Sequence, residues 1–193
     1  KNSIFAVATK KVVTKKVVSQ ESMMTEIFEK KKSPFYHFGQ LMKLGKLPYD
    51  DFHEYLSKRL KTCFPDNHNK LADSILAYTG CHPYYTQQLA SNVWQLGVLQ
   101  PDVSDVIRVA IDTIVTTHGL DYERLWMNFK RTNKWILQRL ALNSVLQTGE
   151  QRTSTIYSAL KRLQKEGYVI YSERYQIEDP FFKEWIIKQA NGS

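Results

Sequence analysis

The sequence is poor in cysteine and has no long apolar run. Only two of its 193 residues are cysteine, and Cys63 and Cys81 match no metal-ligand spacing, which excludes a disulfide scaffold and a zinc-finger type of site. No apolar stretch approaches the roughly 20 residues that span a membrane, and nothing near residue 1 resembles a signal peptide. We therefore expect a folded cytoplasmic protein with reduced thiols and no membrane partner.

The motifs of the common catalytic sites are also missing. None of the eight glycines begins the G-x-x-x-x-G-K-[S/T] loop that cradles a nucleotide's phosphates, and no apolar run ends in paired acids. The five histidines form neither H-E-x-x-H nor another paired metal spacing. We expect this chain by itself to have no catalytic residue, no metal site and no cofactor.

The net charge of +8 is distributed unevenly along the chain. Residues 1–46 hold ten Lys and no Arg against three acids, a net charge of +7, and residues 47–118 carry −3. Residues 119–193 carry +4. This pattern indicates separate modules with separate partners, anionic at the two ends, although a solvated lysine surface also explains it.

Residues 1–47 combine an unusual repeat with a readable helix. Thr9-Lys-Lys-Val-Val is repeated at once from Thr14, a five-residue period that fits neither a strand nor a helix. A β-rich edge segment and a basic tail for nucleic acid both remain open. From Ser19 to Lys32 an apolar face of Met23, Met24, Ile27 and Phe28 predicts a helix, and the apolar residues around Lys43 and Lys46 predict a short strand before Pro48.

Residues 48–118 read as a compact helical unit. Its four expected helices are Pro48–Leu60, Asn67–Tyr78, Pro83–Leu96 and Ser104–Thr117. In the third helix we expect Tyr85, Leu89 and Trp94 to share one face, and in the fourth we expect Val109 within the buried stripe. Between the second and third helices, Gly80 suits a left-handed helix end and Pro83 suits a first helical turn.

Residues 119–193 begin a second unit. One long helix is expected over Asp121–Leu142, followed by a basic helix over Arg152–Glu166 and by two short strands up to Ile177. Asp179 is expected to cap a final helix that starts at Pro180. A basic helix followed by a hairpin is typical of a winged helix. The complete chain is thus expected to be mainly α, of the α+β type.

The basic helix is the candidate for binding DNA, because a recognition helix presents donors to phosphates and base edges along one face. The candidate DNA-binding residues are Arg152, Thr153, Ser154, Thr155, Tyr157, Ser158, Lys161, Arg162 and Lys165. One feature disfavours this function. Only Asn143–Gln151 separates the long helix from the basic helix, which leaves too little chain for the first helix of a helix-turn-helix.

Several segments together resemble prokaryotic AAA/STAND-type (archaeal-type) P-loop ATPases. Gly80–Leu89, GCHPYYTQQL, is similar to the G-x-H-P-Y-Y-x-Q-x-L segment of that family, and Ser19–Phe28, SQESMMTEIF, is similar to a segment that follows its sensor strand. Thr155–Val169 and Tyr175–Trp185 resemble the family's recognition helix and C-terminal ending. The TKKVV repeat departs from the family pattern.

The resemblance implies three parts. Residues 1–47 would be a strand-helix-strand remnant of the α/β nucleotide-binding core, 48–118 the helical lid and 119–193 the winged helix. It also implies that Gly80, His82, Pro83, Ser19 and Gln20 sense nucleotide, while ATP and Mg²⁺ belong to the parent protein. The alternative for the Gly80–Pro83 turn is a purely structural helix cap.

We therefore expect the regulatory C-terminal region of an AAA/STAND-type ATPase. It would couple the nucleotide state of an upstream P-loop core to a winged helix, without catalysis by this chain. The alternatives are a stand-alone winged-helix DNA-binding regulator and a module that binds another protein or itself.

Overall fold

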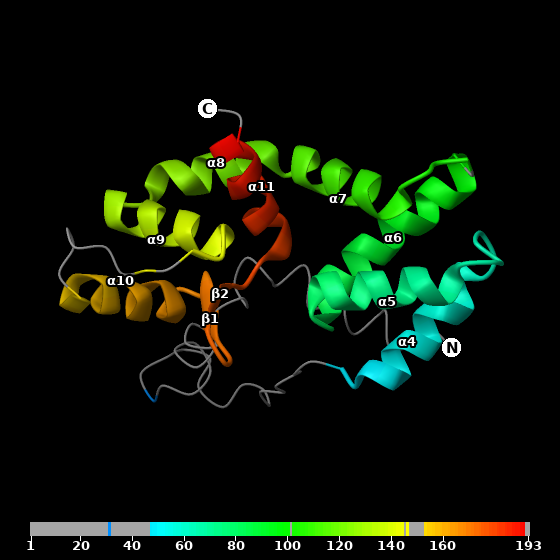
Figure 1. The fold of residues 1–193 in the computed structure, drawn as a ribbon, viewed down its shortest axis with the longest axis horizontal. Coiled ribbons are helices and arrows are strands. Elements are labelled where there is room, and N and C mark those ends of the chain that lie inside the picture. Colours follow the sequence, from blue (N-terminus) through cyan, green and yellow to red (C-terminus); the bar gives the residue numbers. More distant parts are fainter. Residues whose placement is uncertain (1–30, 32–46, 101, 145, 147–152, 192–193) are drawn as a thin grey trace.

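The fold is known from a computed structural model that describes residues 31, 47–100, 102–144, 146 and 153–191. Within these residues it is mainly helical, with eight helices and one two-stranded antiparallel sheet (Figure 1). The helix expected over Ser19–Lys32, the TKKVV repeat and most of the strand near Leu47 lie outside the described residues. No helix in the described ranges is long and apolar enough to cross a membrane.

The first four helices are close to those expected from the sequence. They are α4 (Tyr49–Leu60), α5 (His68–Thr79), α6 (Pro83–Leu99) and α7 (Val106–Thr117). Helix α5 ends at Gly80, whose φ of 58° is left-handed, and α6 begins with Pro83 in its first turn. The predicted break between these helices is confirmed, because glycine tolerates this φ and proline lacks an N–H group to satisfy.

Two residues of these helices, Trp94 and Val109, were expected on the buried faces but are exposed. Trp94 is 46% exposed, and its neighbour Val93 is fully buried in its place. Tyr85, Leu89 and Val93 recur every four residues and so share a face, from which Trp94 is rotated by a further 100°. In α7 the buried residues Val106, Ala110 and Ile114 also recur every four residues, and Val109 lies off this face and is 37% exposed.

The long helix expected over Asp121–Leu142 is also wrong, because the structure has two helices there. Helix α8 (Gly119–Asn128) stops at Phe129, whose φ of −78° and ψ of 138° are extended, and α9 (Arg131–Ala141) follows. The break turns the Phe129 ring into the core, edge-on to Tyr168 at a ring distance of 4.9 Å. Burying this ring outweighs the helix propensity of the sequence around it. A complete helix, α9, therefore precedes the basic one.

The C-terminal part follows the expected order. Helix α10 (Thr153–Lys165) leads into β1 (Val169–Tyr171) and β2 (Tyr175–Ile177), which pair with Val169 opposite Ile177. Helix α11 (Pro180–Asn191) closes the described chain. Oδ1 of Asp179 accepts hydrogen bonds from the backbone N–H groups of Phe181 and Phe182, which confirms the predicted cap.

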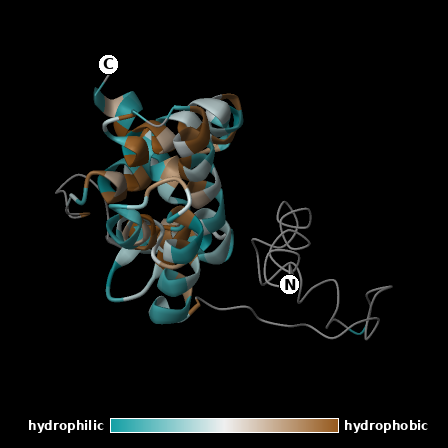
Figure 2. Cartoon of the chain, turned by 90° about the vertical axis from the view of Figure 1, so that its right-hand side faces the viewer, coloured by the Kyte–Doolittle hydropathy of each residue, from teal (hydrophilic) through white to brown (hydrophobic). Residues whose placement is uncertain are grey.

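One continuous buried cluster runs through all eight helices and the sheet, and Figure 2 shows the hydrophobic residues gathered between the helices. Helix α11 packs against α7, α8, α9 and β2, so it touches both the first and the second half of the chain. Phe181 and Phe182 are almost fully buried at its start. The Phe181 ring lies 5.8 Å from Tyr78 and 6.0 Å from Tyr85, centre to centre, and so joins α11 to α5 and α6.

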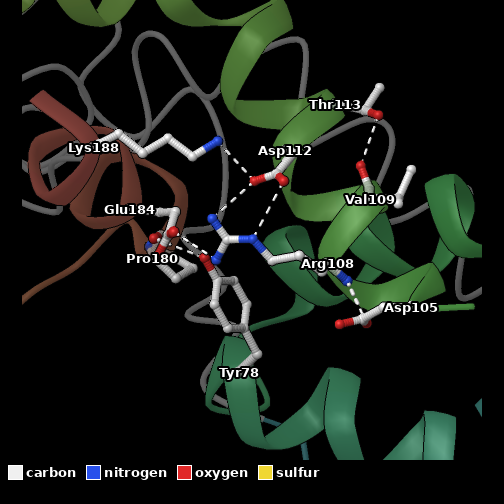
Figure 3. A network of polar contacts seen from close by, with 9 residues as sticks. All are labelled: Tyr78, Asp105, Arg108, Val109, Asp112, Thr113, Pro180, Glu184 and Lys188. Carbon is white, nitrogen blue, oxygen red and sulfur yellow. Dashed lines mark hydrogen bonds and ion pairs between the residues drawn. The ribbon is translucent and has the colours of Figure 1, made fainter. Parts of the chain in front are cut away.

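A polar network on α7 and α11 reinforces this junction (Figure 3). Arg108 forms ion pairs with Glu184 at 2.8 Å and with Asp112 at 3.0 Å, and Lys188 binds Asp112 at 2.7 Å. Burial by itself would raise the pKa of Asp112, but the Lys188 hydrogen bond and the Arg108 charge outweigh it and hold that pKa below 3.8. The hydroxyl of Tyr78 donates to the carbonyl oxygen of Pro180 at 3.2 Å.

Candidate nucleic-acid interface

Helix α10 is amphipathic, which fixes the side that it presents to solvent. Ile156, Ala159, Leu160 and Leu163 are buried at helical spacing. The helix ends in a Schellman-type turn, in which Gly167 has a φ of 79° and Tyr168 donates its N–H to the carbonyl of Leu163 at 2.9 Å. The turn directs the chain from α10 straight into β1.

The exposed side of α10 carries hydroxyl and basic groups. Its exposed residues are Ser154, Thr155, Tyr157, Ser158, Lys161, Arg162 and Lys165. No acidic residue occurs between Thr153 and Lys165, and the next one is Glu166. The ammonium group of Lys161 lies 5.5 Å from the centre of the Tyr157 ring. This side of α10 therefore suits an anionic partner.

Arg162 differs from the other basic residues of the helix. Its guanidinium donates to Oδ1 of Asn133 on α9 at 2.8 Å, and Asn133 is only 4% exposed. A charge-assisted hydrogen bond to a buried amide ties α10 to α9. Arg162 thus has a structural partner on α9.

Of the nine predicted DNA-binding residues, the structure brings seven onto the exposed side of α10, and one of the seven, Arg162, is hydrogen-bonded to Asn133 of α9. Thr153 is the first residue of α10, and Arg152 lies outside the described residues.

A cleft of about 660 Å³ is lined by both strands of the sheet and by no residue of α10. Its walls are the turn between α5 and α6, the end of α9, both strands and the start of α11. Polar and aromatic side chains dominate the lining, among them Asn143, Ser144, Tyr171, Arg174, Tyr175 and Lys183. Tyr171 is 59% exposed, and its ring meets that of Tyr175 edge to face at 4.9 Å.

The Gly80–Pro83 turn forms part of the same cleft. Nε2 of His82 lies 3.4 Å from Oε1 of Glu178, and its ring lies 4.6 Å from the Tyr85 ring. The Tyr85 hydroxyl donates to the other oxygen of Glu178. Burial, with the nearby carboxylates Asp179 and Glu178, raises the pKa of Tyr85, so this hydroxyl remains protonated. Below the turn, the buried hydroxyls of Thr79 and Thr86 are 2.6 Å apart.

Gly80, His82 and Pro83, the predicted nucleotide-sensing residues that the structure describes, therefore lie together at the junction of β2 and α11. Ser19 and Gln20 lie outside the described residues. Their nucleotide-sensing role stays a prediction.

Sequence reasoning missed the residues that complete these two surfaces. Asn133 looked like an ordinary residue within a long helix, and its burial depends on the break at Phe129. Tyr171 and Arg174 were assigned to a hairpin, but nothing in the sequence indicates that the hairpin faces the Gly80 turn. A basic residue beside exposed aromatics in a short hairpin was the only available signal.

The described part of the chain contains no group of three His, Cys, Asp or Glu side chains able to hold a metal ion. A second hollow of about 960 Å³ lies between α8, α9 and α11, and its lining includes Trp126, Trp135 and Trp185. Its basic side chain Arg139 is stacked on Trp135 at 5.5 Å, so this hollow suits an anionic partner less well than the surface of α10.

Comparison with known proteins leaves these surfaces to be interpreted from their own chemistry. No family model matches the sequence, and no curated protein or solved structure shows significant similarity to it.

Proposed function

We propose that residues 131–191 form a winged helix that binds double-stranded DNA through the exposed side of α10. Helices α9 and α10 followed by the β1–β2 hairpin have the order of a winged helix, with α10 as the recognition helix. Helix α9 supplies the preceding helix that a helix-turn-helix requires.

The observation that carries the proposal is the absence of acid from the exposed side of α10. Hydroxyl groups of Ser154, Thr155 and Ser158 occupy its first two turns, where side-chain and backbone donors commonly contact phosphates. Lys161 and Lys165 follow on the next turns, where they add positive charge. A surface of this kind favours a polyanion, and duplex DNA is the polyanion that a helix of this placement contacts in a winged helix.

The test is a titration of labelled duplex DNA with the full chain at several salt concentrations. We expect the logarithm of the affinity to fall linearly with the logarithm of the salt concentration. Each of Lys161→Ala and Lys165→Ala should weaken binding and reduce the slope by about one. Lys58→Ala, which removes an exposed lysine from α4, is the matched control and should leave the slope unchanged. Negligible duplex affinity at low salt would refute the proposal.

A second candidate function is regulation within an AAA/STAND-type ATPase. A specific observation favours it, namely the contact of the Gly80–Pro83 turn with Glu178 between β2 and α11. A nucleotide held by an upstream P-loop core, with Mg²⁺, would then act on a turn that is already joined to the winged helix. The sequence contains no phosphate-binding loop of its own, so hydrolysis would belong to that core.

This second candidate is tested by the intact mass of the endogenous protein. A mass well above 22.6 kDa, together with a P-loop peptide upstream of residue 1, is the expected result. In that longer protein, His82→Ala should change ATP affinity while the duplex affinity of the winged helix at saturating nucleotide stays the same. A native mass of about 22.6 kDa would reject the candidate.

A further inference from the structure

The cleft between the hairpin and the Gly80 turn has the chemistry of a nucleotide-strand site. Arg174 and Lys183 supply positive charge, and Tyr171 and Tyr175 supply aromatic rings. The single carboxylate in its lining, Glu178, is already engaged with His82 and Tyr85. Aromatic rings on which bases stack, combined with cations that follow the backbone, are the usual features of proteins that bind single strands.

The size of the cleft selects one strand over two. Its volume of about 660 Å³ lies in the range of pockets that hold small organic ligands, and both the Gly80 turn and the hairpin line it. One or two unpaired nucleotides fit such a space, whereas a duplex does not. Tyr171 and Tyr175 meet edge to face, so neither ring covers the other completely, and Tyr171 keeps more than half of its surface exposed.

The position of the cleft connects it to α10. Lys165 ends α10, and β1 begins four residues later at Val169. Helix α10 packs against β1, so a strand that leaves a duplex bound on α10 at its Lys165 end meets the hairpin next, and Tyr171 and Arg174 of the hairpin line the cleft. The two surfaces are therefore consecutive along one path.

We infer that the cleft binds unpaired nucleotides of a DNA strand that continues from the duplex on α10, so that the protein recognises a junction between duplex and single-stranded DNA. The inference rests on the proposed duplex-binding function and identifies the form of DNA for that site.

The experiment measures the affinity of the full chain for three labelled probes: a blunt duplex, the same duplex with a single-stranded extension, and the single strand alone. The wild-type protein should bind the extended duplex roughly tenfold more tightly than the blunt one, the effect of stacking one or two bases. Tyr171→Ala and Arg174→Ala should each remove most of this preference and change blunt-duplex affinity by less than about twofold, since neither residue belongs to the surface of α10. Tyr49→Ala, which removes an exposed tyrosine from α4, is the matched control and should leave the preference intact.

Two results would overturn the inference while leaving the proposed function in place. One is equal affinity of the wild-type protein for the blunt and extended duplexes. The other is a preference for the extended duplex that survives both Tyr171→Ala and Arg174→Ala. If the first result is accompanied by binding of free ATP in the cleft, the ligand of the cleft is a free nucleotide and not a DNA strand. If instead the single strand binds in a Tyr171-dependent manner and no duplex binds, the cleft assignment holds and the duplex function of α10 fails.

Discussion

Replacing Phe181 with alanine should destabilise both halves of the chain at once. Its ring is fully buried between Tyr78 of α5 and Tyr85 of α6, at ring distances of 5.8 and 6.0 Å. Removing a buried phenylalanine ring costs about 3–5 kcal/mol, from lost transfer free energy together with the cavity that remains. A domain of ordinary stability has about 5–15 kcal/mol in total, so this loss is a large share of it.

Urea-induced unfolding, followed by far-ultraviolet circular dichroism and by tryptophan fluorescence, measures this effect. We expect the two signals of the wild-type protein to change together and the Phe181→Ala midpoint to shift down for both. Leu120→Ala is the matched control, because Leu120 is apolar but 70% exposed, and it should change the free energy of unfolding by less than about 0.5 kcal/mol.

Two outcomes would refute this reasoning. A loss below about 1 kcal/mol in Phe181→Ala would mean that the ring is not tightly packed between α5 and α6. Separate wild-type transitions would mean that the two halves fold independently and that Phe181 does not join them.

Three further predictions concern a close backbone approach, an ion pair and an interhelical hydrogen bond. A Cβ atom at Gly97 would lie 2.5 Å from the ring of Phe64, so Gly97→Ala should lower the free energy of unfolding, measured in urea, by about 1–3 kcal/mol. Gly119→Ala is the control and should not lower it, because a Cβ atom at Gly119 meets nothing within 4 Å. The pKa of Asp112 is lower in the folded protein than in the unfolded chain, so its carboxylate stabilises the fold at a pH above the unfolded-state pKa. The difference in unfolding free energy between wild type and Asp112→Asn should therefore be constant above about pH 5 and shrink as the pH falls below 3.8. A difference that grows in acid would contradict this prediction. Arg162→Ala should lower the free energy of unfolding by about 1–3 kcal/mol, because it leaves a buried amide oxygen without its donor, and an unchanged midpoint would show that this hydrogen bond does not stabilise the fold.

The elements that local chemistry determines could be predicted from the sequence. Gly80 and Pro83 fix the break between α5 and α6 because one residue tolerates a left-handed φ and the other starts a helix. Asp179 and Pro180 mark the start of α11 in the same way. In each case the determining residues lie within a few positions of the feature, so a short window of sequence contains the information.

The break at Phe129 could not be predicted, because its cause lies far away in the chain. The residues around it are compatible with a continuous helix, and the decisive contact is with Tyr168, 39 positions later. The same is true of the candidate site. The exposed side of α10 follows from helical periodicity, whereas the cleft requires Gly80, Tyr171 and Lys183 to meet through tertiary packing. The proposed division of the chain near residue 118 stays a prediction.

The junction formed by α11 limits where any conformational switch can act. A hinge between α4–α7 and α8–α11 would have to expose Phe181. It would also have to break the two ion pairs that join α7 to α11, Arg108–Glu184 and Asp112–Lys188. Exposing one buried aromatic side chain alone costs about 1.5–3 kcal/mol, and the buried cluster is continuous across this boundary. Interfaces that are large and apolar do not open readily. A nucleotide or DNA signal received at the Gly80 turn is therefore expected to move the described helices α4–α11 as one body, so that the cleft keeps its shape while α10 is reoriented together with the other helices.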